Sequence, residues 1–442
     1  MSAPSRVAPP DRRADARAPF RVPPFPLPAR LGLGAWRALT RLGLPAPRFD
    51  EAALVAAAKR RTGLEDFGSE AFRTPMRRLL AAFDEEAALH LLGRAVLQSS
   101  VVRALECRLR LERIRAVDPA LEATPVRAPV FITGMQRTGT TKLHRLLACA
   151  PELRHLSSAE GLNPCPLGLP VRDEPGEAER RMAFAKRAER GMRYMSPALF
   201  AIHPIEADAP EEDVFLFDVT FISPAVDASL SVPSYTRWIR EIDQRPPYAY
   251  VRRLIQCLLW QAPVPPRPGA RPAQRYLGKT PHHQENLDVL FDVFPDAKVI
   301  HTHRDPLEVV PSFSSMMAHA GAMLSSRVDP FEVGRRVADQ MTNSVERAIA
   351  ARAKVGSGRV LDVRYRDLQR DPIGELRRIH AFAELEWNGE SEARAKRWLD
   401  GNPQHKYGTH RYGLADFGLD AEELAARFKP YRERFGVESR MG

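Results

Sequence analysis

The stretch VFITGMQRTGTTKLHRLLA, residues 130–148, constrains the fold of this chain more than any other segment. It opens with an apolar run at 130–132, typical of a buried parallel strand, and closes with leucines at helical spacing over 143–147. Between them, Gly134 and Gly139 frame a turn. Such a turn aims successive backbone N–H groups and the positive end of the helix dipole at one point. The sequence therefore predicts an α/β fold with a phosphate-binding loop.

The loop differs from the usual P-loop in the position of its charge. The spacing from Gly134 to Gly139 matches the P-loop pattern, but Thr140 stands where the pattern has lysine. The positive charge lies inside the loop instead, at Arg137. Two glycines, an arginine and three threonines in one short segment favour an anion site over a tight turn that binds nothing.

The chain of 442 residues is longer than one average domain, and its composition changes along its length. Residues 1–30 are rich in Pro and Arg and predict a disordered arm, which is either solvated or in contact with an anionic membrane. Residues 31–124 predict an N-terminal helical layer. A P-loop-type parallel sheet flanked by helices is expected over 125–442, interrupted by a Pro/Arg-rich connection at 263–274.

Net charge and cysteine content limit which ligands and which cellular compartment are expected for this chain. Lys and Arg exceed Asp and Glu by 11, which favours anionic ligands, anionic membranes or nucleic acid. No nucleic-acid motif is present, so no nucleic-acid partner is expected and a small anion is favoured. The four cysteines have no paired spacing, which argues against a disulfide framework or a zinc site. Without a signal peptide or an apolar run long enough to span a bilayer, the chain is expected to be cytoplasmic.

A second informative region, residues 276–315, predicts a strand–helix–strand unit. The first strand ends at Lys279, and the second, at 298–303, is followed by Arg304. Ligands of a parallel sheet bind at the carboxyl ends of its strands. Either cation alone would be interpreted as a solvated charge at a loop entry, but together with the anion-shaped loop they favour a site.

With the loop at 134–141, Lys279 and Arg304 in this order, the chain resembles the bacterial branch of the sulfotransferases that use 3′-phosphoadenosine 5′-phosphosulfate (PAPS). GMQRTGTT resembles the phosphosulfate loop of that family, and RDP with a serine eight residues after the arginine, here Arg304 and Ser312, resembles its 3′-phosphate motif. VRYRDLQRDP, at 363–372, is similar to the segment whose tyrosine, here Tyr365, lies near the adenine. HKYGTHRYGLADFGLD, at 405–420, resembles a bacterial C-terminal loop.

This resemblance implies transfer of a sulfuryl group from PAPS to a hydroxyl or amine of a small acceptor, with no metal required. Arg137, where the family often has lysine, would contact the 5′-phosphate and the bridging oxygen, and Lys279 would bring a second cation to the sulfuryl group. Both are therefore candidate catalytic residues. The donor-binding residues that the resemblance implies are Gly134, Arg137, Thr138, Gly139, Thr140, Thr141, Arg304, Ser312 and Tyr365.

The acceptor hydroxyl also needs a base. In PELRHLSSAEGLNP, the position of a glutamate that serves in several family members is similar to Glu160. His203 and Glu212, in HPIEADAPEEDVF, compete for this role. His282 and His283 are further candidates, for which helix capping or packing is the alternative interpretation.

The acceptor itself is only weakly indicated. Aromatic and aliphatic residues concentrate near 190–262, a helical segment in which they either line an apolar acceptor pocket or form core. A hydrophobic or lipid-like alcohol is therefore favoured over a sugar.

Two other classes of protein stay open besides a sulfotransferase. A P-loop nucleotide phosphotransferase would need a lysine at position 140 and a magnesium-holding aspartate, and a non-catalytic nucleotide-binding protein would need no base.

Overall fold

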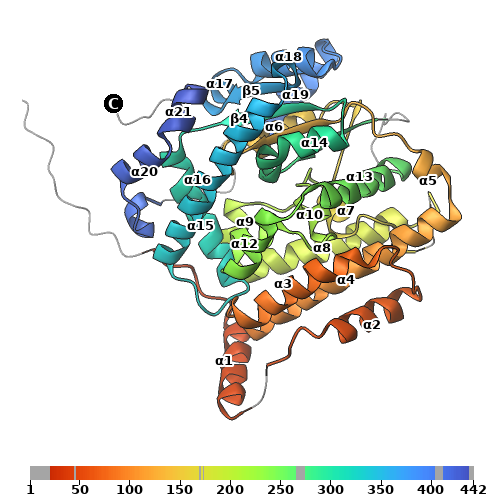
Figure 1. Cartoon of the computed structure of the whole chain (residues 1–442), viewed down its shortest axis with the longest axis vertical. Helices are drawn as coiled ribbons and strands as arrows, with labels where there is room; N and C mark the ends of the chain where they lie inside the picture. The colour runs from red at the N-terminus through yellow and green to blue at the C-terminus, as the bar shows by residue number, and fades with distance from the viewer. Residues whose placement is uncertain are drawn as a thin grey trace, which may run out of the picture.

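The computed structural model describes residues 20–43, 46–168, 171–172, 174–264, 274–403 and 412–437. These residues form one parallel five-stranded sheet flanked by helices (Figure 1). The strands are β1 Val130–Gly134, β2 Leu153–His155, β3 Arg275–Lys279, β4 Lys298–His303 and β5 Val360–Arg364, in the order β2-β3-β1-β4-β5. The predicted fold class, a P-loop-type parallel sheet flanked by helices, is confirmed.

Strand β1 lies in the centre of the sheet and is buried along its whole length. On one side Val130 pairs with Leu277 of β3, and on the other with Lys298 of β4. The helices over the two faces are α13 (Arg245–Trp260) and α14 (Leu287–Val293) on one side, and α6 (Thr140–Leu147) and α18 (Pro372–Ala383) on the other. A strand covered on both faces needs apolar residues at successive positions, which explains its uninterrupted apolar run.

The N-terminal helices pack into the rest of the protein. They are α1 Leu27–Arg41, α2 Glu51–Thr62, α3 Arg73–Glu85, α4 Leu91–Val117 and α5 Ala120–Ala123. Helices α2 to α4 share a core with residues 221–239, while α4 also sends Leu111 and Ile114 into the core beneath the sheet. Two hydrophobic cores thus contain residues from both sides of the boundary predicted at residue 124. The division into domains stays a prediction.

The predicted basic arm overlaps the first helix. Residues 1–19 lie outside the described residues, but α1 begins at Leu27, before the boundary expected at residue 30. Pro28 stands in the first helical turn, where its missing N–H has no carbonyl partner to lose. A proline-rich segment was therefore compatible with a helix start.

The segment near 190–262 is helical, with four short helices between two longer ones. They are α8 Glu177–Met195, α9 Pro197–Ile202, α10 Val214–Asp218, α11 Pro224–Ser229, α12 Pro233–Glu241 and α13. Phe217 and Tyr248 belong to the core beneath the sheet, and Phe221 and Tyr235 to the core of the N-terminal helices. Of the two interpretations of this segment, core packing therefore accounts for these aromatic residues.

A fourth core joins the helices that follow β4 to the end of the chain. The remaining helices are α7 Ser158–Leu162, α15 Pro306–Ala322, α16 Pro330–Lys354, α17 Tyr365–Arg370, α19 Gly389–Gly401, α20 Ala421–Arg427 and α21 Lys429–Phe435. Of these, α15, α16, α20 and α21 pack together.

Residues 265–273 of the Pro/Arg-rich connection and 404–411 of the predicted C-terminal loop lie outside the described residues. None of the described helices has the length and apolar content that a membrane span requires.

Candidate active site

The loop between β1 and α6 keeps its shape because two of its residues lack a side chain. Gly134 has a φ of +136°, and a Cβ there would lie 2.4 Å from the carbonyl oxygen of Thr302 in β4. Gly139 has a φ of +91°, and its Cβ would lie 2.8 Å from Cδ2 of Tyr365. Both positions therefore require glycine. The first N–H groups of a helix have no carbonyl partner within it, so this loop presents the start of α6 as an anion site.

Arg137 is the cation of the loop, and its backbone has a φ of +66°, an uncommon value for a residue with a side chain. Its Nε donates to Oγ of Ser312 at 3.0 Å, and its Nη1 donates to the carbonyl oxygen of Ile202 at 3.2 Å. Burial, with the charge of Arg304 adding to it, lowers the pKa of Arg137 from its ordinary value. Because a guanidinium stays charged at neutral pH, Arg137 is a positioned cation whose environment favours a bound anion.

The three threonines of the loop differ in where their hydroxyls point. The Thr138 side chain is fully buried, and its hydroxyl donates to the Met135 carbonyl oxygen at 2.6 Å and contacts the Thr302 hydroxyl. This hydroxyl braces the loop, so only the backbone of Thr138 is left for the predicted donor contact. Thr140 and Thr141 begin α6 and line the cavity above it.

Arg304, directly after β4, lies against the same loop. Its Nη1 donates to the carbonyl oxygen of Arg137 at 3.0 Å, and its guanidinium lies 4.2 Å from the ring centroid of Tyr365. Its Nε and Nη2 both donate to Oε2 of Glu308, at 3.0 and 2.7 Å. Ser312 is buried and accepts the Nε–H of Arg137. The Ser312 hydroxyl thus faces the loop arginine, and the pocket that Ser312 and Arg304 would share for a phosphate stays a prediction.

Lys279, the last residue of β3, is a second cation near the loop. Its side chain is only 1% exposed, and its Nζ donates to Oε1 of Glu212. The backbone fixes this pair, because the N–H of Asp213 donates to the carbonyl oxygen of Lys279 at 2.9 Å. The Asp213 carboxylate in turn accepts from the Tyr276 hydroxyl at 2.6 Å and contacts His283. A buried polar network therefore holds the ion pair in place.

These side chains meet around a cavity of about 590 Å³ at the carboxyl ends of the central strands. The predicted site residues that line it are Arg137, Gly139, Thr140, Thr141, Arg304 and Tyr365. Both alternative bases, His203 and Glu212, line it as well. Lys279 contacts the cavity-lining Glu212, and Gly134 ends the strand from which the loop starts. The structure thus assembles one candidate site from segments far apart in the sequence.

His203, directly after α9, is placed to accept a proton in this cavity. One of its ring nitrogens and a carboxylate oxygen from each of Glu211 and Glu212 lie within 4.8 Å of one another. Burial lowers the pKa of His203 below that of an ordinary histidine, and the charges of Lys279 and Arg137 add to this effect while the two glutamates oppose it. The imidazole is therefore neutral near pH 7 and has a lone pair available.

Glu160 does not line this cavity. Its carboxylate is completely buried, paired with Arg154, and accepts the N–H groups of Ser157 and Val264, each at 3.0 Å. Burial alone would raise the pKa of Glu160, but the charge and hydrogen bonds of Arg154 lower it below its ordinary value. The prediction of Glu160 as the base is corrected, because Ser157 and Glu160 form the capping box of α7.

The two histidines that follow β3 are packing residues. His283 is buried between the Tyr248 hydroxyl, at 2.9 Å, and the carboxylate of Asp213, at 3.2 Å. His282 packs against the rings of Phe217 and Tyr248, and burial lowers its pKa to about 3. The packing interpretation therefore accounts for both.

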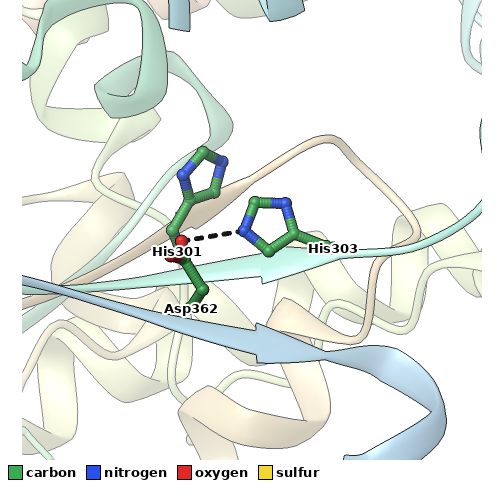
Figure 2. Close-up of side chains that lie close together, drawn as sticks. All are labelled: His301, His303 and Asp362. Atoms are coloured by element: carbon green, nitrogen blue, oxygen red, sulfur yellow. Dashed lines mark hydrogen bonds and ion pairs between the residues drawn. The ribbon is translucent and has the colours of Figure 1, made fainter. Parts of the chain in front are cut away.

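A separate group of His301 and His303 on β4 with Asp362 on β5 lies on one face of the sheet (Figure 2). His303 contacts Oδ1 of Asp362 through Nε2 at 3.0 Å, and contacts the Tyr431 hydroxyl through Nδ1 at 3.0 Å. The other carboxylate oxygen of Asp362 accepts from Arg352 at 3.0 Å. This geometry could hold a metal ion, but the carboxylate and His303 already have polar partners within the protein.

A sequence model of the sulfotransferase family matches residues 129–389, the part of the chain that contains the whole sheet and the loop. The chain belongs to the sulfotransferase family. This confirms the resemblance seen in the sequence.

Curated relatives and solved structures of mycobacterial sulfotransferases agree with this assignment. Omega-hydroxy-beta-dihydromenaquinone-9 sulfotransferase Stf3 of Mycobacterium bovis and of M. tuberculosis is 26% identical over 262 residues, which span 57% of this chain and 61% of the relative. The crystal structure of STF1 from M. tuberculosis H37Rv is 29% identical with a TM-score of 0.75, covering 87% of this chain and 100% of that one. STF9 from M. avium is 28% identical with a TM-score of 0.77, covering 89% and 99%.

This sulfotransferase family member has cavity residues that sequence reasoning missed. Lys142, in the first turn of α6, donates to Oε1 of Gln369 at 3.1 Å, and burial lowers its pKa. Its position just past the loop was a usable signal. Trp398, on α19, adds a flat apolar wall from the far end of the chain. No local pattern marks that tryptophan as part of the site.

We predict that Glu160→Gln destabilises the fold without weakening nucleotide binding. The substitution leaves the Arg154 guanidinium buried without its counter-ion, which costs roughly 3–5 kcal/mol. Urea denaturation of the wild type and variant measures this loss, and the double variant Arg154→Met/Glu160→Gln should recover part of it. Since the pKa of Glu160 is lowered by folding, its contribution is present above pH ~4.3 and lost at lower pH. Wild-type stability of Glu160→Gln would contradict the structural role.

Proposed function

We propose that this protein transfers a sulfuryl group from PAPS to a hydroxyl of a small, apolar acceptor. The observation that supports this most is the arrangement of Arg137 and Lys279 near one cavity with the neutral His203. Cations that stabilise a leaving phosphate and a base that accepts a proton are what such a displacement requires. Family membership of the chain supports the same reaction class.

The donor would lie with its phosphosulfate over the start of α6. The N–H groups of Thr140 and Thr141 and the guanidinium of Arg137 would receive the 5′-phosphate. Arg304 and Tyr365 line this cavity and also a neighbouring one of about 710 Å³. The second cavity offers further cations, Arg364, Arg366 and Arg370, beside the carboxylates of Asp305, Glu308 and Asp367. A nucleotide with a second phosphate would therefore reach from one cavity into the next past Arg304.

The chemistry divides among three side chains. As the S–O bond to the donor phosphate breaks, negative charge develops on that phosphate, and Arg137 stabilises it without giving up a proton. Lys279 would contact the sulfuryl oxygens once the donor competes with Glu212 for its ammonium group. His203 would take the acceptor proton as the new S–O bond forms, which a neutral imidazole can do.

The acceptor is proposed from the cavity and from the relatives. Its walls include the apolar side chains of Ala201, Met316, Trp398 and Leu399, next to the polar loop. The curated relatives are named for a menaquinone derivative that bears an omega-hydroxyl group. An alcohol on an apolar skeleton fits both observations. Incubating the protein with PAPS and a panel of such alcohols, then searching by mass spectrometry for products that gain one SO₃ unit, tests the proposal.

We predict that the protein binds adenosine 3′,5′-bisphosphate more tightly than adenosine 5′-monophosphate. Arg304→Ala should remove most of this preference, because a charge-assisted arginine contact is worth about 1.5–3 kcal/mol, or roughly 10- to 150-fold in affinity. Isothermal titration with both nucleotides measures the preference. Arg187→Ala, an exposed change on α8, is the matched control and should behave as wild type. Equal affinities for the two nucleotides in the wild type would refute the 3′-phosphate site.

A second prediction concerns the base. His203→Asn should lower the turnover rate by roughly 10²–10⁴ and remove the acidic limb of the pH–rate profile, which in the wild type should lie below pH ~6.5 because the pKa of His203 is lowered. Glu212→Gln should slow turnover through misplacement of Lys279 but leave that limb in place. The reverse pattern, with the limb lost only in Glu212→Gln, would assign the base to Glu212.

A third prediction concerns metals. The ligand atoms of His203, Glu211 and Glu212 are close enough to hold an ion, but the Lys279 ammonium already lies against Glu212. We therefore expect activity to survive EDTA. Loss of activity on chelation, with recovery on adding magnesium, would favour the phosphotransferase alternative.

A further inference from the structure

Helix α1 carries an unusual share of the exposed apolar surface. Of nine large apolar side chains exposed in the part of the chain that the structure describes, four lie on this helix or at its end: Leu27, Leu31, Leu39 and Leu42, between 47% and 84% exposed. No residue of α1 is buried. Single exposed leucines are ordinary, but four on one helix form a patch.

Three of these four leucines are on the side of α1 that faces away from the protein. At about 3.6 residues per turn, Leu27, Leu31 and Leu42 fall on one side of the helix. The half-buried Leu33 and Trp36 fall on the opposite side. In Figure 1, α1 stands out at the lower end of the molecule, and it contacts α4. The leucine side is therefore unpartnered within the described chain.

A row of positive charge runs beside the leucines. Arg30, Arg37 and Arg41 are all exposed and follow one another at helical spacing. Around them, residues 16–49 contain six arginines and no acidic residue. The helix thus combines an apolar face with a cationic flank that has no acidic neighbours in the sequence.

We propose that α1 docks on an anionic lipid surface. The leucines would enter the boundary between headgroups and acyl chains, while the arginines contact lipid phosphates. A second copy of this chain would fit the same face poorly, because it would bring two rows of arginine together in a chain of net charge +11. A membrane supplies both an apolar interior and the opposite charge. This docking requires neither donor nor acceptor, so it stands apart from the proposed function.

Vesicle flotation of the full chain tests the proposal. The protein should float with phosphatidylcholine vesicles that contain phosphatidylglycerol and not with phosphatidylcholine alone, and added salt should weaken the binding. Leu27→Ser/Leu31→Ser/Leu42→Ser should bind roughly 100-fold more weakly, since its apolar face is lost. Tyr194→Ser, which changes an exposed apolar residue of α8, should bind as wild type.

The charge component has its own variants. Arg30→Gln/Arg37→Gln/Arg41→Gln should lose the preference for anionic vesicles. The matched control removes three exposed charges from α8: Lys186→Gln, Arg187→Gln and Arg190→Gln. Because α1 buries no residue and the α8 controls change only exposed side chains, all variants should unfold at the wild-type temperature. Equal flotation with neutral vesicles, no flotation at all, or a dimer that the leucine variant breaks in sedimentation velocity would each overturn the proposal.

Discussion

The close contact between the loop after β1 and the end of β4 is the constraint on which the site depends. Gly134 lets the loop backbone pass against Thr302, where any side chain would collide with the carbonyl oxygen. Arg304 then donates to the carbonyl oxygen of Arg137, so the Arg304 guanidinium is anchored to the loop itself. Because β1 lies between β3 and β4, the ends of both neighbours flank the loop, and Lys279 comes close from the other side. The strand order of the sheet thus brings Arg137, Lys279 and Arg304 close to one another.

Carboxylates balance that charge in the structure. Glu212 accepts from Lys279, and Glu308 accepts from Arg304, while Arg137 has only neutral acceptors as hydrogen-bond partners among the described contacts. A bound donor with phosphate and sulfuryl oxygens would exchange these carboxylates for its own groups. Such exchange costs less than exposing buried cations that have no partner. The glutamates therefore keep the cations aligned without a ligand, and we infer that they move aside when one binds.

The sequence predicted those features of the site that depend on residues close together in the chain. The apolar run at 130–132, the two loop glycines and the positions of Lys279 and Arg304 at strand ends all appear in the structure as expected. Contacts between distant segments were beyond that reasoning. Ser312 faces Arg137 because of how α15 packs, and Trp398 reaches the cavity from α19, which no spacing reveals.

Other contacts between distant segments could not be predicted from the sequence either, whereas the structural role of Glu160 could have been. Three scattered cysteines meet in the core, with the Cys165 sulfur 3.6 Å from that of Cys107 and 3.8 Å from that of Cys257. The Ser157–Glu160 pair, however, carried a capping-box spacing that already favoured a structural carboxylate. The most direct test of the whole account is a crystal structure with adenosine 3′,5′-bisphosphate. We expect the 5′-phosphate on the first N–H groups of α6 and the 3′-phosphate beside Arg304, whereas a nucleotide bound through a metal ion or in another cavity would contradict this assignment of the site.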